Sequence, residues 1–191
     1  MVLVGLRHAQ SIFNVTKRSR PDCGLSAEGV RQAKLLKGVF AYVVCSPLVR
    51  TRRTLELSSI TYGNIEYEEL ARERRDDICD FLPSEPGVKE THIDFATRMK
   101  KLDERLRSLE RAHPQVLLVA HAYVLIALQR LRSGLRLPLD NDEAQAIGAE
   151  YGEDSTPNAR LFNLPYGGSS TDYQTGRGDG ANSECQSTIL P

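Results

Sequence analysis

Three short apolar runs in the chain each end abruptly in polar residues. The runs and the residues that follow them are 2–6 before Arg7 and His8, 39–45 before Ser46 and Pro47, and 116–120 before His121. Runs of this length and composition are typical of buried parallel strands. Because ligands of parallel α/β sheets bind at the carboxyl ends of the strands, the three polar endings are predicted to meet at one site.

Helical periodicity separates these runs. Ser26 is a candidate N-cap for one amphipathic helix, and Thr91, with Asp94 three residues later, for a longer one that stops at Pro114. Their apolar positions are Val30, Ala33 and Leu36 in the first helix, and Ala96, Met99, Leu102, Leu106, Leu109 and Ala112 in the second. Residues 123–131 are nearly all apolar, as expected of a helix packed on a sheet. The alternation predicts an α/β fold, a three-layer doubly wound sandwich with a mostly parallel central sheet.

The length of 191 residues and the hydrophobic content of 40% fit a single packed core. Residues 166–191, by contrast, are rich in Gly, Ser, Thr, Asp and Asn and contain hardly any aliphatic side chain before Ile189. Such a segment cannot bury enough apolar surface to offset the entropy lost on ordering. We therefore predict one domain over 1–165 and a disordered C-terminal tail over 166–191.

The net charge is zero, because 25 basic side chains balance 25 acidic ones. No overall field points to nucleic acid or to an anionic membrane, and neither is predicted as a partner. No apolar run approaches the roughly 20 residues that span a bilayer, and the N-terminus lacks a secretory leader pattern, so a cytoplasmic protein is expected. The four cysteines are scattered without CxxC spacing, which argues against structural zinc and a disulfide framework.

Arg7 and His8 form a candidate reactive pair at the end of the first apolar run. A neighbouring guanidinium disfavours the imidazolium form, and a neutral imidazole is a nucleophile toward phosphorus. The guanidinium itself can bind two oxygens of a phosphate. Taken alone, the pair also fits an exposed Arg-His dipeptide at a strand end, so the chemical interpretation needs support from elsewhere in the chain.

Five elements between residues 2 and 125 supply this support. They are R-H-A at 7–9 followed by Asn14, D-C-G-L-S-A-E-G-V-R-Q-A at 22–33, S-P-L-V-R-T-R-R-T at 46–54, L-A-R-E at 70–73, and V-A-H-A at 119–122. In type and order they resemble the signature elements of the histidine phosphatase (phosphoglycerate mutase-like) superfamily: R-H-G, D-x-x-L-[ST]-x-x-G-x-x-Q-A, S-P-L-x-R-x-x-x-T, a segment with a proton-donating Glu, and V-S-H-G. The resemblance implies a phosphoglycerate mutase-like fold and a histidine phosphatase-like catalytic domain.

The resemblance also implies a role for each matching residue. His8 would accept the phosphoryl group, Glu73 would protonate the leaving oxygen, and His121 would donate to the transferring oxygens. A carboxyl near several cations tends to be ionised, so proton donation by Glu73 requires partial burial or coupling to the substrate. Arg7 and Arg50 would neutralise the phosphate, so no metal and no cofactor is expected. The residues expected to bind the substrate phosphate are Arg7, Asn14, Arg50, His121 and Ala122.

Several positions depart from the signature elements. Ala9 and Ala122 stand where the elements have glycine, and their methyl groups are expected to narrow the floor of the pocket. Ala120 replaces a serine, and the glycine usual shortly after the acidic residue is missing behind Glu73. The sequence around residues 72–80 looks like that of a plant and protist branch of phosphoglycerate mutase-like proteins.

The predicted function is that of a metal-independent, phosphohistidine-forming phosphatase of the histidine acid phosphatase type, acting on a small phosphorylated metabolite. The segment between Thr54 and Thr91 is short, so water should reach the site, and hydrolysis is favoured over a phosphoglycerate mutase-type transfer. A catalytically silent module that only binds phosphate is the alternative from a different class. Residues 55–95 are expected to select the substrate. No oligomeric state is predicted.

Overall fold

The computed structural model of the chain describes residues 2–18, 20–85, 87–138, 140, 142–143 and 158–164. The predicted tail, 166–191, lies outside the described residues. At the centre of the described part is a five-stranded sheet with the strand order β3-β2-β4-β1-β5. Its strands are β1 (Val2–Arg7), β2 (Lys37–Cys45), β3 (Ser59–Tyr67), β4 (Gln115–Ala120) and β5 (Leu161–Leu164). The pairs β1–β4, β2–β4 and β2–β3 are parallel and only β5 runs antiparallel, which confirms the mostly parallel sheet.

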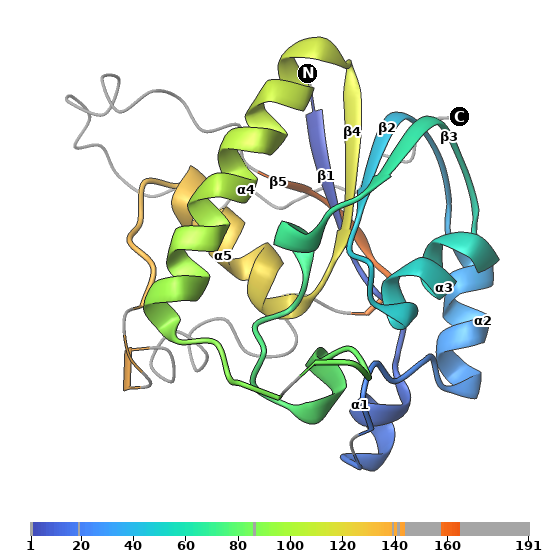
Figure 1. Cartoon of the computed structure of the whole chain (residues 1–191). Coiled ribbons are helices and arrows are strands. Elements are labelled where there is room, and N and C mark those ends of the chain that lie inside the picture. Colours follow the sequence, from blue (N-terminus) through green and yellow to red (C-terminus); the bar gives the residue numbers. More distant parts are fainter. Residues whose placement is uncertain are drawn as a thin grey trace, which may run out of the picture.

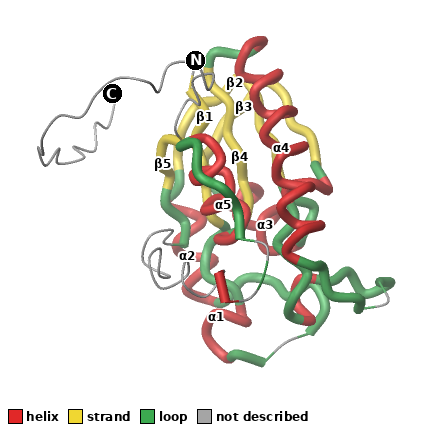
Figure 2. The backbone as a smooth tube through the Cα atoms, turned by 90° about the vertical axis from the view of Figure 1, so that its left-hand side faces the viewer, coloured by secondary structure: helices red, strands yellow, loops and turns green. Residues whose placement is uncertain are grey.

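Helices cover both faces of this sheet (Figure 1). The helices are α1 (Ile12–Thr16), α2 (Ala27–Leu35), α3 (Val49–Leu57), α4 (His92–Ala112) and α5 (Ala122–Arg132), and η1 (Glu69–Ala71) and η2 (Ile78–Asp80) are short 3-10 helices. The pair α4 and α5 lies on one face, the pair α2 and α3 on the other, and α1 lies beyond the edge at which β1 ends (Figures 1 and 2). This is the predicted three-layer α/β sandwich. Among the described residues, no helix combines the length and the apolar character needed to cross a membrane.

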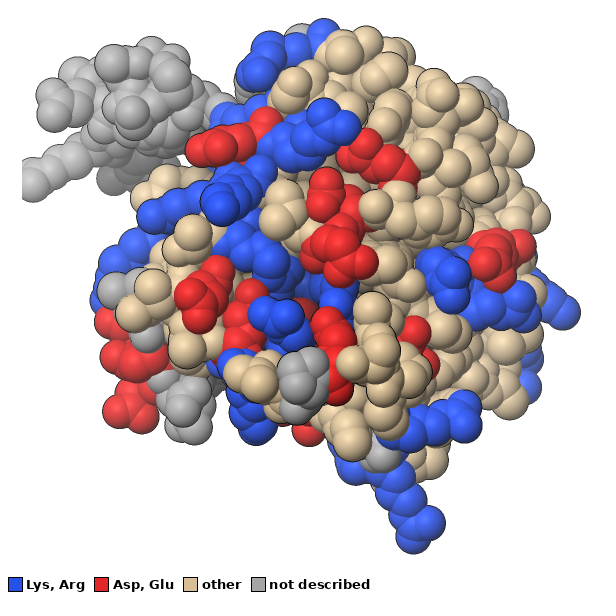
Figure 3. Space-filling view, in the orientation of Figure 1, with Lys and Arg blue, Asp and Glu red and all other residues tan. Residues whose placement is uncertain are grey.

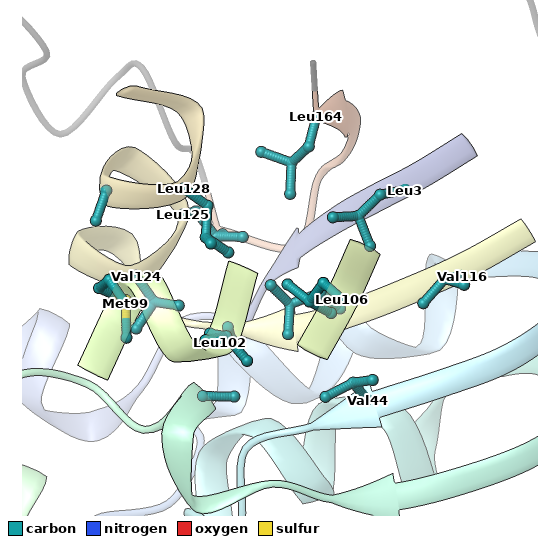
Figure 4. Close-up of a cluster of buried hydrophobic side chains, with 14 of the residues drawn as sticks. Leu3, Val44, Met99, Leu102, Leu106, Val116, Val124, Leu125, Leu128 and Leu164 are labelled. Atoms are coloured by element: carbon teal, nitrogen blue, oxygen red, sulfur yellow. The ribbon is translucent and has the colours of Figure 1, made fainter. Parts of the chain in front are cut away.

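Burial of the central strands on both faces explains their continuous apolar sequence. Along β4, Val116 and Leu118 pack with α4 and α5, whereas Leu117 and Val119 pack with α2 and α3. A strand with a helical layer on each side needs no polar position, in contrast to the alternation of a half-exposed strand. The cluster between the sheet and α4–α5 is drawn in Figure 4, where Met99, Leu102 and Leu106 face Leu3, Val44 and Val116 of the strands.

The long helix α4 follows the expected stripe. Of its six predicted apolar positions only Ala112, in the last turn, is exposed. Its N-cap Thr91 accepts a hydrogen bond from the backbone N–H of Asp94 at 3.1 Å, as expected.

A buried ion network also joins α4 to α5: Arg132 donates to Asp103 at 2.7 Å and to Glu110 at 2.7 Å.

Two edge strands, β3 and β5, do not show the apolar run that marks the central strands. The edge strand β3 has one buried residue, Ile60, among exposed and half-buried neighbours, so it shows no apolar run. The strand β5 is only four residues long and is added antiparallel to β1 at the other edge. Edge strands contact the core with few residues, and their sequences therefore carry a weak hydrophobic signal.

Helix α2 holds the loop that follows β1. The backbone N–H of Ser26 donates to the carbonyl of Gln10 at 2.9 Å, and its hydroxyl donates to Gln10 Oε1 at 2.8 Å. The backbone N–H of Gln10 in turn donates to Gln32 Oε1 at 2.9 Å. A Cβ on Gly29 would overlap the carbonyl of Gln10. The Ser, Gly and Gln of the 22–33 element therefore act together to seat this loop.

We expect Gly29→Ala to destabilise the protein. Helix propensity alone would favour alanine by about 1 kcal/mol, but the overlap with the Gln10 backbone forces α2 and the loop apart, at a cost of about 1–3 kcal/mol or more. The net effect should be a Tm lower by several degrees, measured by thermal denaturation followed by circular dichroism.

Gly24→Ala is the matched control, because the nearest atom to a Cβ at Gly24 is Val49 Cγ1 at an ordinary 3.7 Å. Its Tm should stay near that of the wild type. Equal stability of the two variants would show that the packing of α2 on the loop tolerates a side chain, contrary to this account.

Candidate active site

The strand ends open onto one cavity of about 460 Å³. Arg7 and His8 reach it from the end of β1, Arg50 from the first turn of α3, and Glu73 from the segment after η1. The structure thus brings together four of the five predicted catalytic residues in one cavity lining. The predicted phosphate-binding residues Asn14 and Ala122 also line it. Figure 3 shows that Lys and Arg are interspersed with Asp and Glu on the face it views.

The ring of His8 is fixed by its own backbone surroundings. Its Nδ1 lies 2.8 Å from the carbonyl oxygen of Ala9. A carbonyl can only accept, so Nδ1 carries the proton, and a neutral ring then has its lone pair on Nε2. The backbone is held by the bonds from His8 N to Ala120 O at 3.0 Å and from Ala9 N to Thr54 Oγ1 at 2.9 Å. This tautomer is the one that a nucleophile needs.

Burial and positive charge keep His8 neutral. Loss of solvent is the largest cause, and the guanidinium groups of Arg50 and Arg7 add to it, so that the pKa of His8 lies well below the ordinary value of 6.5. The hydrogen bond to Ala9 opposes this shift but does not reverse it. At neutral pH the imidazole is therefore unprotonated at Nε2.

His121 lies behind His8. The centroids of the two rings are 5.2 Å apart, but His121 is fully buried and does not belong to the described residues that line the cavity. Burial, followed by the charge of Arg50, holds its pKa well below the ordinary value. It therefore meets His8 at the edge of the sheet but does not share the cavity lining with the other four predicted catalytic residues.

Ser46 orients the ring of His121. Its hydroxyl oxygen lies 2.8 Å from His121 Nε2 and accepts from the backbone N–H of Leu48 at 3.5 Å. When the Ser46 hydroxyl donates to Nε2, the ring proton of a neutral His121 lies on Nδ1. That Nδ1 is buried without a hydrogen-bond partner in the described structure. It is the donor that a phosphoryl oxygen entering beside His8 could engage.

The side chain of Arg50 is anchored by η2. Its Nη1 donates to the carbonyl of Cys79 at 2.8 Å and its Nη2 to Asp80 Oδ1 at 2.8 Å. Thr54, one turn later in α3, donates to the Arg50 carbonyl at 2.7 Å while accepting from Ala9. The Arg and Thr of the 46–54 element thus tie α3 to the nucleophile loop and to η2.

Glu73 has the environment of a proton donor. Its Oε1 accepts from the N–H of Arg74 at 3.0 Å and its Oε2 from the N–H of Tyr123 at 3.3 Å. Burial and then the charge of Asp80 raise the pKa of Glu73 to about 7, against the opposing charge of Arg50. Burial is therefore the main reason why Glu73 keeps its proton. About half of such carboxyls are protonated at neutral pH.

Two further groups can meet an anion at the cavity. Asn14 caps α1 together with Ser11, from whose N–H its Oδ1 accepts at 2.9 Å, which leaves the Asn14 amide nitrogen as donor to a ligand. Ala122 is the first residue of α5, and its methyl lines the cavity. Ala9, in contrast, is fully buried and does not belong to the described lining, so the expectation that its methyl narrows the pocket floor is wrong.

The far wall of the cavity comes from the segment 55–95, from α5 and from residues that follow α5 in the chain. Arg74 contacts His92 Nε2 at 3.0 Å and Asp76 at 2.8 Å, and its guanidinium lies over the ring of Tyr123 at 5.7 Å. The apolar part of this wall is formed by Phe95, Tyr123, Ile126, Ala127, Leu137 and Pro138. The expectation that 55–95 selects the substrate included this segment only as a whole, and no single residue of the wall was predicted, because single positions of a helix face carry no motif.

The remaining cations of the 46–54 element point elsewhere. Arg52 and Arg53 are exposed, and Arg53 pairs with Glu56 at 2.9 Å. Within the described ranges, no group of three or more His, Cys, Asp and Glu side chains could hold a metal ion. The described cysteines, Cys23, Cys45 and Cys79, are buried and not disulfide-bonded.

Comparison with protein families identifies the sequence. The family model of the histidine phosphatase superfamily (branch 1) matches residues 3–149. Comparison with curated protein sequences gives no significant match.

Solved structures share the fold. An alpha-ribazole phosphatase from Shigella flexneri superposes with a TM-score of 0.56 at 20% identity, covering 71% of this chain and 81% of that one. A phosphoglycerate mutase from Bacillus anthracis gives 0.54 at 18% identity, covering 74% and 84%. A mycobacterial glucosyl-3-phosphoglycerate phosphatase gives 0.51 at 24% identity, covering 74% and 82%. These bacterial structures do not support the narrower plant and protist branch.

We expect His8 and His121 to stay neutral, with the proton on Nδ1, at pH values where an ordinary histidine is already protonated, because burial and the charge of Arg50 lower the pKa of both rings. Long-range ¹H–¹⁵N correlation spectra of ring nitrogens would show both tautomers directly. Ser46→Ala should remove the partner of His121 Nε2 and mix the tautomers of His121, while His8 keeps its own. Unfolded protein in urea is the control, because every histidine should then titrate normally. A His8 ring protonated on Nε2 in the folded protein would contradict this assignment.

Proposed function

The chain belongs to branch 1 of the histidine phosphatase superfamily, and from this premise we propose that it is a phosphatase that forms a phosphohistidine at His8 and releases it to water. The observation that carries the proposal is the neutral His8 ring, with Nδ1 bound to Ala9 O and Nε2 left to react beside Arg7 and Arg50. The proposed substrate is a small phosphorylated metabolite.

In the first step, His8 Nε2 attacks phosphorus in line with the leaving oxygen. The N–P bond forms as the P–O bond breaks, and Glu73 gives its proton to the leaving alkoxide. The imidazole becomes positively charged while it retains the proton on Nδ1. The carbonyl of Ala9, 2.8 Å from that nitrogen, stabilises this charge.

The donors around His8 stabilise the transferring phosphoryl group. Arg7 and Arg50 supply fixed positive charge in a buried setting, where it acts more strongly than in water. The unpartnered Nδ1–H of His121 and the amide of Asn14 add directed hydrogen bonds. These groups are in place before substrate arrives, so little reorganisation accompanies the reaction.

In the second step, water replaces the leaving alcohol. The Glu73 carboxylate takes a proton from the water as its oxygen attacks phosphorus, the N–P bond breaks, and His8 returns to its neutral form. Inorganic phosphate leaves, and Glu73 is protonated again. A mutase would instead return the phosphoryl group to a second hydroxyl of a bound substrate. The short connection from α3 to α4 favours the entry of water.

The cavity is larger than a phosphate ion requires. Its apolar wall and the Arg74–His92 pair lie beyond the reacting groups, where the alcohol part of a phosphomonoester would reside. The intact set of His8, Glu73 and Arg50 supports turnover over a silent phosphate-binding module.

His8→Ala should abolish both turnover and the covalent intermediate, because it removes the nucleophile. The measurement is acid-free trapping of ³²P-labelled protein after rapid quench in base, where phosphohistidine is stable. His113→Ala is the matched control, since His113 packs against Tyr42 with ring centroids 4.7 Å apart and does not line the cavity. It should label and turn over like the wild type. Undiminished labelling of His8→Ala would place the nucleophile at another residue.

Glu73→Gln should slow alkyl phosphates far more than 4-nitrophenyl phosphate, because nitrophenolate leaves without a proton. General-acid catalysis contributes about 10²–10⁴-fold, so the alkyl ester should lose roughly that factor. In the wild type, alkyl ester hydrolysis should fall as pH rises through about 7, where Glu73 loses its proton. The exposed Glu69→Gln is the control. Equal loss with both esters would exclude Glu73 as the acid.

A further inference from the structure

One buried carboxyl beside the cavity has no part in the steps above. Asp80 ends η2 and is 6% exposed. Its Oδ1 accepts from Arg50 Nη2 at 2.8 Å and its Oδ2 from the backbone N–H of Asp77 at 3.1 Å. Its own carbonyl accepts from Arg72 Nη2 at 2.8 Å. Both oxygens and the backbone of Asp80 are therefore held in place.

The contacts of Arg50 differ from those of a purely structural arginine. Arg132, between α4 and α5, donates from Nε, Nη1 and Nη2 to Asp103 and Glu110 and lies outside the described cavity lining. Arg50 has one N–H of each Nη directed at η2, and it lines the cavity. A guanidinium has five N–H donors, so the donors of Arg50 that do not bind η2 are available to a ligand in the cavity.

We propose that Asp80 is a positioning residue for phosphoryl transfer: together with the Cys79 carbonyl it fixes the Arg50 guanidinium so that its remaining donors meet the phosphoryl group beside His8. This inference rests on the proposed function of the site. A long arginine side chain has many rotamers. The hydrogen bonds to the Asp80 carboxylate and to the Cys79 carbonyl select one of them before substrate binds. The side-chain entropy of Arg50 is therefore lost on folding and not on substrate binding.

Asp80 also acts on the proton donor through its charge. The groups that face Glu73 are Asp80 from η2, Arg50 from α3 and Tyr123 from α5, with the neighbouring Arg74. Burial raises the pKa of Asp80, and the Arg50 guanidinium, whose Nη2 lies 2.8 Å from Oδ1, opposes that rise and favours the ionised carboxylate. Its negative charge raises the pKa of Glu73, and Arg50 lowers it. Loss of Asp80 would therefore remove the negative charge that opposes the effect of Arg50 on Glu73.

Two substitutions separate the positioning effect from the charge effect. Asp80→Ala removes the carboxylate and its contact with Arg50, so inorganic phosphate should bind about 10-fold more weakly or worse, the value of a lost charge-assisted hydrogen bond. Asp80→Asn keeps an oxygen that can accept from Arg50, and its phosphate affinity should stay within a few-fold of the wild type. In both variants the alkaline limb of the alkyl phosphate profile should move to lower pH, by about one unit.

Glu110→Gln is the matched control, because it weakens a buried arginine pair that is remote from the cavity lining. It should lower the Tm without moving the phosphate affinity or the pH profile. Phosphate binding is measured by calorimetry, and turnover against pH, at a temperature where circular dichroism shows every variant folded.

The readouts distinguish this inference from the proposed function. Wild-type protein that binds phosphate tightly but turns over no phosphomonoester would overturn the proposed function, while the affinity of Asp80→Ala would still test the positioning of Arg50. Asp80→Ala with wild-type phosphate affinity and an unmoved alkaline limb would overturn the inference, whatever its stability.

Discussion

Three consecutive backbone N–H groups after β1 are each bound by a different segment of the fold. His8 donates to Ala120 at the end of β4, Ala9 to the Thr54 hydroxyl of α3, and Gln10 to the Gln32 side chain of α2. Two carbonyls of the same loop also make contacts. The carbonyl of Ala9 accepts from the His8 ring, and the carbonyl of Gln10 packs against Gly29 of α2. The position of the nucleophile therefore depends on the central sheet and on the layer formed by α2 and α3, and a displacement of either would move it.

The electrostatics of the site follow from burial combined with this geometry. Burial lowers the pKa of both histidines and raises that of Glu73, and the arginines push the histidines in the same direction. One residue type is thereby kept as a base and the other as an acid at the same pH. Environments that push the pKa values of two groups apart separate their catalytic roles. Arg50 acts against the acid, and the Asp80 carboxylate beside it offsets that effect.

The elements that the sequence pattern predicts well are those with dense apolar contacts or strict backbone requirements. The strands β1, β2 and β4 are buried on both faces, and their polar endings meet as expected. Gly29 of α2 and the N-cap Ser26 have a backbone reason: a Cβ at Gly29 would overlap the Gln10 carbonyl, and the Ser26 hydroxyl accepts from the Gly29 N–H. The edge strand β3 was not predicted, because only Ile60 is buried in it.

Burial depth and side-chain pairing could not be predicted in the same way. A histidine after an apolar run fits both a cavity wall and a position behind it, and only the fold places His121 in the second, with Ser46 at its Nε2. Asp80 lies in a short segment of mixed charge, where solvated carboxylates are the usual case. Its partner Arg50 is 30 residues away in the sequence. Pairings of this kind arise from the path of the chain, which local patterns do not specify.

The division of the cavity explains why the reaction class is easier to infer than the substrate. The groups that touch phosphorus come from strand ends and helix starts, whose residues are limited by backbone geometry and by the chemistry of phosphate. The opposite wall, where Arg74 contacts His92 and lies over the ring of Tyr123, comes from a connection and a helix face, where backbone geometry limits the residue type less. The arginine there already shares its charge with Asp76. A leaving group that binds against this wall would therefore gain more from contact with the apolar side chains than from a second negative charge.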